Sequence, residues 1–359
     1  MASESFQAAL SLAIPAGNIE QQFDALYNLV WVKWILGDSL GAQSLLFRTR
    51  ELARMSADLY KEASALRMEA VCWMPLGNFN QSLLHCDRAR ELLALCDMSG
   101  GRMYYATLTT QAEVHRYKTE YVEAHKIYSQ ILQEVSVEQD AYVYAWCLLW
   151  IAEIEVATGA SHDDVQRKID AAKSNFMGDV RPQELCNILQ AALDARDATR
   201  EHILPVRMAL QKLSRSLWGK DRPILGYCLE ILCVINCQDI SLCTSATVFL
   251  AHSTKYKVRA GINRALYFLA DAFLNQSDEN TATSLLTVAL EGFMAMDIHQ
   301  CRAECMLRLG DISKAQHDIV KAVQLWKTAR PLFERSLQKT QVKCIDERLD
   351  SINGHSEEL

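Results

Sequence analysis

Cysteine and histidine side chains at helical spacing are the residues of this sequence that come closest to a metal site. Cys233 and Cys237 lie four residues apart, as do Cys301 and Cys305, and His299 precedes the second pair. On a helix this spacing would place two thiolates beside one ion. A structural zinc needs four ligands, and neither pair has a matching second pair. Because cysteine is among the most buried residue types, we expect these thiols in the core, and no metal or cofactor.

No catalytic motif is recognisable. The sequence contains no G-x-S-x-G, H-E-x-x-H, Rossmann glycine fingerprint or C-x-x-C. His85 and Cys86 are adjacent, but adjacent residues on a helix point about 100° apart and cannot form a dyad. We therefore expect that the chain is not an enzyme.

Composition and charge limit the partners further. Of 359 residues, 50% are hydrophobic and 23% charged, with only 6 prolines and 14 glycines, which favours a folded, helical chain. The formal charge of −7 argues against nucleic acid, since phosphate binding needs a clustered positive surface. The most apolar stretch, residues 224–235, is too short to cross a bilayer. Scattered cysteines and an N-terminus without a basic segment predict a cytoplasmic protein without a membrane partner.

Along the sequence, apolar segments with helical spacing alternate with short polar breaks. Eight of these breaks recur about 38 to 42 residues apart, which is the period of a repeat of helix pairs with lengthened helices. The predicted turns lie at Gly37-Asp38, Gly77-Asn78, Thr119-Glu120, Gly159-Ala160, Glu201-His202, Asp239-Ile240, Ser277-Asp278 and His317-Asp318.

The residues around these turns fit the same pattern. Gly37, Gly77 and Gly159 can end a helix in the left-handed conformation. Asn78, Asp278 and Asp318 are placed to cap the next helix, Asn78 with Gln81 as a capping box. The second helix then carries a small residue at Ala42, Ser82, Ala124, Ala282 and Ala322, and a larger one four residues later at Leu46, Cys86, Tyr128, Leu286 and Trp326.

These positions carry a family resemblance. MLRLGDISKAQHDIVKAVQLWKTA (306–329) resembles a complete tetratricopeptide repeat, and LGNFNQSLLHCDRARELL (76–93) resembles part of a second. The resemblance implies an all-α fold, an α-solenoid of about eight TPR-like helix-turn-helix repeats with a period near 40 residues. Residues 1–20 would be the remnant of a preceding repeat helix, 21–340 the superhelical array, and 341–359 a helix end and polar tail.

Two middle repeats depart from the pattern. Pro205 falls where the second helix of the fifth repeat should begin, and the sixth repeat keeps only the length. At a finer level, residues 299–336 with the closing IDERLDSI resemble the C-terminal tetratricopeptide region of fungal STAND-type NTPase receptors of the NACHT or NB-ARC class. No G-x-x-x-x-G-K-[ST] phosphate loop is present, so the sequence is also compatible with a truncated relative or a fragment.

The family resemblance implies a binding groove on the first helices of the pairs. Its predicted protein-binding residues are Tyr27, Trp31, Trp34, Arg67, Met74, Glu113, Arg116, Glu153, Arg264, Tyr267, Asp271 and Asp311. We expect a non-catalytic scaffold that binds a peptide or protein segment, as the sensor part of a STAND-type protein. The alternatives are a small-ligand-sensing TPR-like regulator, which a deep pocket with convergent polar groups would favour, an enzyme with a site in the fifth or sixth repeat, and a decayed gene fragment.

Overall fold

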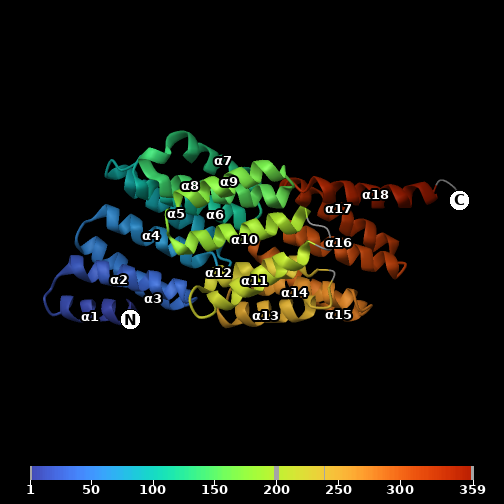
Figure 1. Cartoon of the computed structure of the whole chain (residues 1–359), viewed down its shortest axis with the longest axis horizontal. Coiled ribbons are helices and arrows are strands. Elements are labelled where there is room, and N and C mark those ends of the chain that lie inside the picture. Colours follow the sequence, from blue (N-terminus) through green and yellow to red (C-terminus); the bar gives the residue numbers. More distant parts are fainter. Residues whose placement is uncertain (1, 198–201, 238, 357–359) are drawn as a thin grey trace.

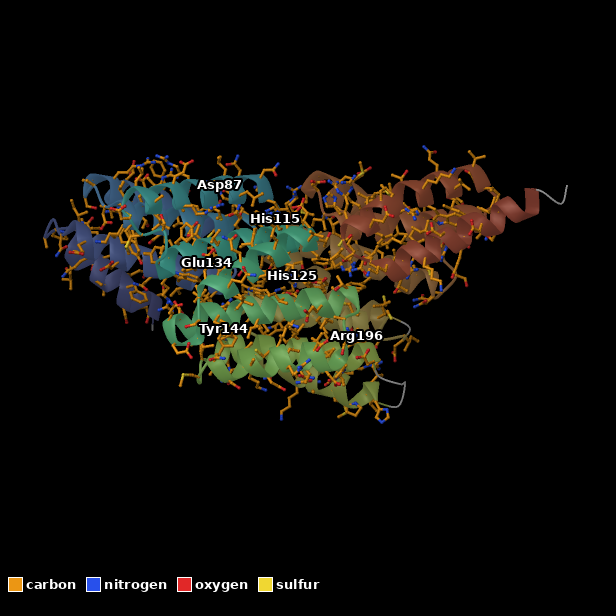
Figure 2. The ribbon with its side chains drawn as sticks, turned by 90° about the horizontal axis from the view of Figure 1, so that it is seen from above. Asp87, His115, His125, Glu134, Tyr144 and Arg196 are labelled. Atoms are coloured by element: carbon orange, nitrogen blue, oxygen red, sulfur yellow. The ribbon has the colours of Figure 1, made fainter. Side chains whose placement is uncertain are left out.

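The computed structural model describes residues 2–197, 202–237 and 239–356. Over these residues the chain forms eighteen α-helices and no strand, which confirms the all-α class. The N-terminal helices (blue) and the C-terminal helices (red) lie at opposite ends of the long axis, in the view of Figure 1 and in the view from above of Figure 2.

Sixteen of these helices form consecutive pairs, and one further helix flanks the pairs at each end. α1 (Ala2–Ala13) packs on α2, and α18 (Lys339–Ser356) packs on α17. The pairs are α2 (Ile19–Ile35) with α3 (Ser39–Met55), α4 (Leu59–Trp73) with α5 (Phe79–Leu95), α6 (Arg102–Tyr117) with α7 (Tyr121–Glu134), α8 (Val137–Thr158) with α9 (His162–Asn175), α10 (Val180–Asp197) with α11 (Ile203–Leu217), α12 (Arg222–Ile235) with α13 (Leu242–Lys255), α14 (Arg259–Leu274) with α15 (Glu279–Met296), and α16 (His299–Ala315) with α17 (Ile319–Arg335).

The eight predicted turns fall between the two helices of a pair, except that Glu201 lies outside the described residues. Gly37, Gly77 and Gly159 have φ values of 79°, 73° and 79°, as a left-handed helix end requires. Pro205 lies in the first turn of α11, where a proline removes no helical hydrogen bond.

The predicted caps are confirmed only in part. Asp278 and Asp318 accept the backbone N–H of Thr281 and Lys321, as N-cap side chains do. Asn78 precedes α5, but its side chain makes no capping hydrogen bond, so the predicted capping box is wrong. Nothing in the structure explains this difference between Asn78 and Asp278.

The alternation of small and large residues sets how closely the two helices of a pair approach. All ten predicted packing positions of the second helices are fully buried, from Ala42 and Leu46 to Ala322 and Trp326. A Cβ atom at Gly310 would collide with the indole of Trp326, so α16 and α17 touch where glycine faces tryptophan. Close approach of this kind is what small residues at helix contacts permit.

Polar side chains join the first helix of one pair to the first helix of the next. The partners in these contacts lie 34 to 40 residues apart, about one repeat. The contacts are Glu113–Trp150, Arg116–Glu153, Arg181–Asp221, Glu230–Arg264, Arg264–Glu304, Asp271–Arg308 and Asp311–Arg348. We call this set the ladder. It joins the third pair to the fourth, the fifth through the eighth pairs in succession, and the eighth pair to α18.

A second set of contacts joins segments far apart in sequence. The backbone N–H of Arg259 donates to Pro75 O at 2.9 Å, and that of Gln300 to Thr119 Oγ1 at 2.8 Å. The Gln338 amide donates to Ala157 O at 2.9 Å, across a separation of 181 residues. We call these contacts, together with the packing of Gly37 on Tyr256, the seam. Through the seam, turns in the first half of the chain lie against pairs in the second half.

The tight packing of the seam makes Gly37 sensitive to a single methyl group. A Cβ atom there would lie 2.5 Å from Cδ1 of Tyr256, whereas at Gly159 it would meet nothing within 4 Å. Both glycines have φ 79° and therefore bear the same backbone penalty. We expect Gly37→Ala to lower the free energy of unfolding by about 1–3 kcal/mol more than Gly159→Ala, as overpacking does. Equal losses in chemical denaturation would show that the seam is not formed in solution.

Helix α8 is long and apolar enough to cross a membrane, and it is the single such helix in the described ranges. Half of its apolar window is buried inside the structure, and the core helix of a soluble protein passes the same test. The helix contributes one wall of the cavity described next.

Candidate functional site

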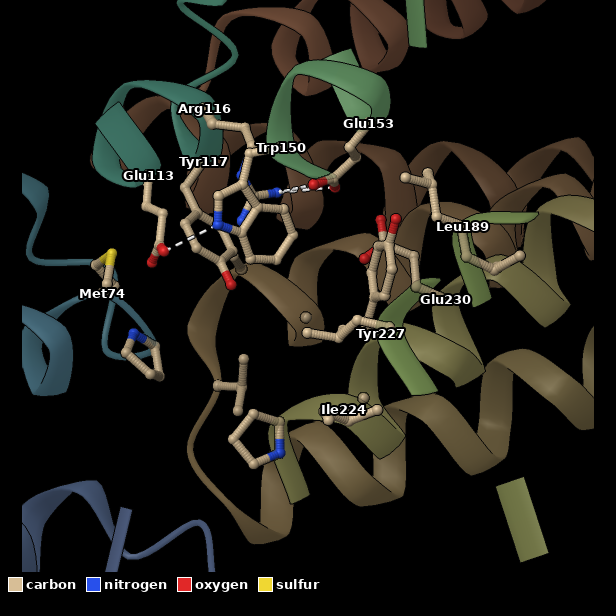
Figure 3. A pocket seen from close by; sticks show the side chains of 18 of the residues that line it. Met74, Glu113, Arg116, Tyr117, Trp150, Glu153, Leu189, Ile224, Tyr227 and Glu230 are labelled. Atoms are coloured by element: carbon tan, nitrogen blue, oxygen red, sulfur yellow. Dashed lines mark hydrogen bonds and ion pairs between the residues drawn. The ribbon is translucent and has the colours of Figure 1, made fainter. Parts of the chain in front are cut away.

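The first helices of the pairs surround a cavity of about 920 Å³. Residues from α2, α4, α6, α8, α10, α12 and α14 line it, together with Gln300 and Cys301 of α16, so all eight pairs contribute to the wall. Figure 3 shows the Arg116–Glu153 ion pair and the Trp150–Glu113 hydrogen bond, with Tyr227 and Glu230 pointing into the same space. The volume is within the range of cavities that hold drug-sized ligands.

The structure brings together eight of the twelve predicted binding residues. The cavity is lined by Trp31, Trp34, Arg67, Met74, Glu113, Arg116, Glu153 and Arg264. The other four do not line it. Tyr27 stacks on Phe23, and Tyr267 is buried in the core. Asp271 and Asp311 belong to the ladder, where they pair with Arg308 and Arg348. Their carboxylates join neighbouring helices.

Arg116 and Glu153 form the most buried ion pair of the cavity wall. Nη1 of Arg116 donates to both carboxylate oxygens of Glu153, at 2.7 and 2.8 Å. The guanidinium also lies over the rings of Trp150 and Tyr117, at 4.2 and 4.5 Å from their centroids. Burial raises the pKa of Glu153, and Arg116 opposes that rise by favouring the carboxylate. The pair is therefore costly to split.

Glu113 is a lining carboxylate without an ion pair in the described part of the chain. Its Oε1 accepts the indole N–H of Trp150 at 3.0 Å. Burial raises the pKa of Glu113, against the opposing field of Arg116. Glu113 is thus the one carboxyl of the wall that forms no ion pair among the described residues. Glu230, by contrast, pairs with Arg264 at 3.1 Å.

Five of the seven lining arginines have a carboxylate partner. Those pairs are Arg102–Asp140, Arg116–Glu153, Arg181–Asp221, Arg196–Asp197 and Arg264–Glu230. Arg67 and Arg222 have none within the described residues. The Arg67 guanidinium lies 5.7 Å from the ring centroid of Trp31, and its Nη1 lies 3.5 Å from the Thr110 hydroxyl oxygen. The Arg222 guanidinium lies 5.0 Å from the ring centroid of Tyr256.

Aromatic rings cover much of the remaining wall. Trp146 and Trp150 stack at 5.3 Å between centroids, and Trp31 and Trp34 meet edge to face at 5.6 Å. Tyr117 is 44% accessible although it lines the cavity, so its free surface faces the enclosed space. Sequence reasoning missed Tyr117, Tyr227 and Arg222 as site residues. All three lie on the first helix of a helix pair or at its end, and this position is the sequence signal that they share.

The two cysteine pairs considered from sequence belong to no group of three metal-binding donors among the described residues. Burial raises the pKa of Cys233 and of Cys301 to about 12. Among the described residues, one group of three donors is close enough for an ion: Glu120, Asp297 and His299. Lys118 pairs with Glu120 at 2.7 Å, and Arg302 pairs with Asp297 at 2.9 Å. The charges of both carboxylates in this group are therefore already neutralised.

Comparison with known proteins gives no family for this chain. No protein-family model matches it, and no curated protein matches it.

Proposed function

We propose that this protein is a non-catalytic binding module that takes a small organic ligand into its central cavity. The observation that carries this proposal is the cavity itself, which is about 920 Å³ in volume and is walled by aromatic rings and by arginine and glutamate side chains. Known ligand sites combine a mostly apolar wall with a few convergent polar groups in the same way. The small-ligand alternative raised from sequence thus becomes the leading function.

Binding of a peptide or protein segment is the second candidate. It is supported by Trp31, Trp34 and Arg67 on the cavity wall, since tryptophan and arginine are frequent interface anchors. The seam weighs against it. Its hydrogen bonds join the first half of the chain to the second, which favours a closed cavity over an open groove for a long segment.

The helix pairs support a further proposal about family. Eight consecutive helix pairs, five of them with a small buried residue at the tight contact, are what a tetratricopeptide-type solenoid would have, and we propose that fold here. A role as the sensor part of a STAND-type signalling protein follows from the sequence resemblance and stays a proposal. A cytoplasmic location follows from the scattered cysteines and the N-terminal sequence and stays a proposal as well.

A thermal-shift screen with a blocked cavity tests the proposed function. Ala106 lines the cavity, and Ala106→Trp places a bulky ring inside it, whereas Ala94→Trp places the same ring on the exposed face of α5. A ligand at about 100 times its Kd should stabilise the wild type and Ala94→Trp by about 2.7 kcal/mol. Ala106→Trp should lose that stabilisation. Equal stabilisation of all three proteins would place the site elsewhere, and a metabolite library without a single hit would reject the proposal.

A further inference from the structure

The charges of the cavity wall do not balance. Seven arginines and three glutamates line it, and the wall contains no lysine or aspartate. After the ion pairs are taken into account, two guanidinium groups, Arg67 and Arg222, and one carboxyl, Glu113, lack a charged partner in the described residues. Burial raises the pKa of Glu113, which means that it disfavours the charged form of this carboxyl. The excess is therefore positive, although the whole chain has a formal charge of −7.

The two unpaired arginines belong to one continuous stretch of wall. The Arg67 guanidinium lies over Trp31, Trp31 meets Trp34 at 5.6 Å, and the Arg181 guanidinium lies over Trp34 at 4.9 Å. Nε of Arg181 donates to Asp221 at 2.6 Å, and Arg222 follows Asp221 directly in the chain. The Arg222 guanidinium itself lies over Tyr256 at 5.0 Å, and Tyr256 packs on Gly37 just past the end of α2, so rings and guanidinium groups line the wall from α4 through α2 to the start of α12.

Each part of this stretch has a chemical preference. Guanidinium groups bind carboxylates and phosphates through parallel hydrogen bonds. The faces of Trp31 and Trp34 favour a flat ring stacked against them or a cation, but the cation positions over both rings are already taken by Arg67 and Arg181. A ligand with a positive charge would meet repulsion from these side chains. A ligand with an oxyanion next to a ring would satisfy both features.

We propose that the cavity binds a ring-containing organic oxyanion, a carboxylate or a phosphate ester, with the anionic group held by Arg67 and Arg222 and the ring against Trp31 and Trp34. This assignment rests on the proposed small-ligand function and names the class of ligand. Carboxylate and phosphate share the same recognition by guanidinium, and matched probes distinguish them.

The test compares oxyanions with their neutral counterparts. Indole-3-acetate is paired with indole-3-acetamide, adenosine 5′-monophosphate is paired with adenosine, and tryptamine serves as the cation. We expect at least one oxyanion to raise Tm and to bind about tenfold more tightly than its neutral partner, as a lost charge-assisted hydrogen bond predicts. Tryptamine should not bind. The oxyanion that binds identifies the carboxylate or the phosphate class.

Arginine variants then locate the site. Arg67→Met and Arg222→Met remove a charge that forms no ion pair among the described residues, so no ion pair is split and both variants should fold, which circular dichroism checks. Arg116 still favours the Glu113 carboxylate when Arg67 is replaced. Each should weaken the oxyanion about tenfold and leave the neutral analogue unchanged. Arg102→Met is the matched control, because Arg102 also lines the cavity but is paired with Asp140.

The outcomes separate this assignment from the proposed function. If neither oxyanion binds more tightly than its neutral partner, or if Arg102→Met has the same effect as Arg67→Met, the assignment is wrong. The proposed function survives that result when any library compound stabilises the wild type but not Ala106→Trp. The proposed function falls when Ala106→Trp makes no difference to binding, or when no library compound stabilises the wild type.

Discussion

Replacing Arg116 with methionine is expected to lower the free energy of unfolding by about 3–5 kcal/mol, because the change leaves Glu153 buried without its partner. Arg116 has a side-chain exposure of 9%, and its guanidinium donates to both oxygens of Glu153. The variant also loses the contacts of the guanidinium with the rings of Trp150 and Tyr117. Chemical denaturation measures the loss.

Two further variants separate the ion pair from general damage to the cavity wall. Arg116→Met/Glu153→Met removes both charges and should recover a large part of the lost stability, as replacement of buried pairs by apolar side chains does. Arg88→Met breaks the surface pair of Arg88 with Glu91, whose side chains are 56% and 61% exposed, and should cost less than about 1 kcal/mol. A loss for Arg116→Met no larger than that for Arg88→Met would contradict the buried geometry.

Placing a carboxylate between α16 and α17 is the second change with a large expected effect. Ala322 is fully buried beside Trp326 and Phe333, in a cluster that holds the last pair to α18. Ala322→Asp forces a charge into this apolar contact without a partner, and we expect a loss of about 4 kcal/mol or more. Hydrogen exchange should show the loss of protection mainly in α16, α17 and α18.

Val320→Asp gives the matched control on the same helix. Val320 is 81% exposed, so the same carboxylate there meets water, and the stability should change by no more than about 0.5 kcal/mol. If Ala322→Asp and Val320→Asp were equally stable, the pairing of α16 with α17 through Ala322 would be wrong.

The helix pairs could be predicted because their signals are local. A left-handed glycine such as Gly77, a capping aspartate such as Asp318 and a small residue such as Ala124 act within one pair, over fewer than about 40 residues. Their order along the sequence therefore fixes where each helix begins and ends. The failure at Asn78 shows the limit of such signals, since a capping residue in the right place does not always form the cap.

The cavity was predicted in part for the same reason. Trp31, Arg116 and Arg264 were found because the first helices of an array share an inner face. Asp271 and Asp311 satisfy the same spacing rule, but they do not line the cavity. Asp271 pairs with Arg308, and Asp311 pairs with Arg348, so both carboxylates join neighbouring helices instead. Spacing alone cannot distinguish a side chain that faces a ligand from one that faces the next repeat.

Enclosure of the cavity could not be read from the sequence. It depends on contacts between segments far apart in sequence, such as those of Pro75 with Arg259 and of Ala157 with Gln338. No local pattern encodes these contacts. Sequence reasoning missed Arg222 for this reason. Arg222 and Trp34 are far apart in sequence, and they line the same cavity only in the folded chain.

The seam also has a consequence for how the chain reaches its native state. An open array of repeats folds through contacts between neighbours, so its contact order is low and it can start anywhere. Contacts between residues 181 apart, such as Gln300 with Thr119, require closure of a loop of that length, with an entropic cost of about 4–5 kcal/mol. The pairs can form early and independently, whereas the cavity exists only once this late closure is complete. We therefore expect the cavity to be the last part of the molecule to form and the first to be lost when the two halves separate.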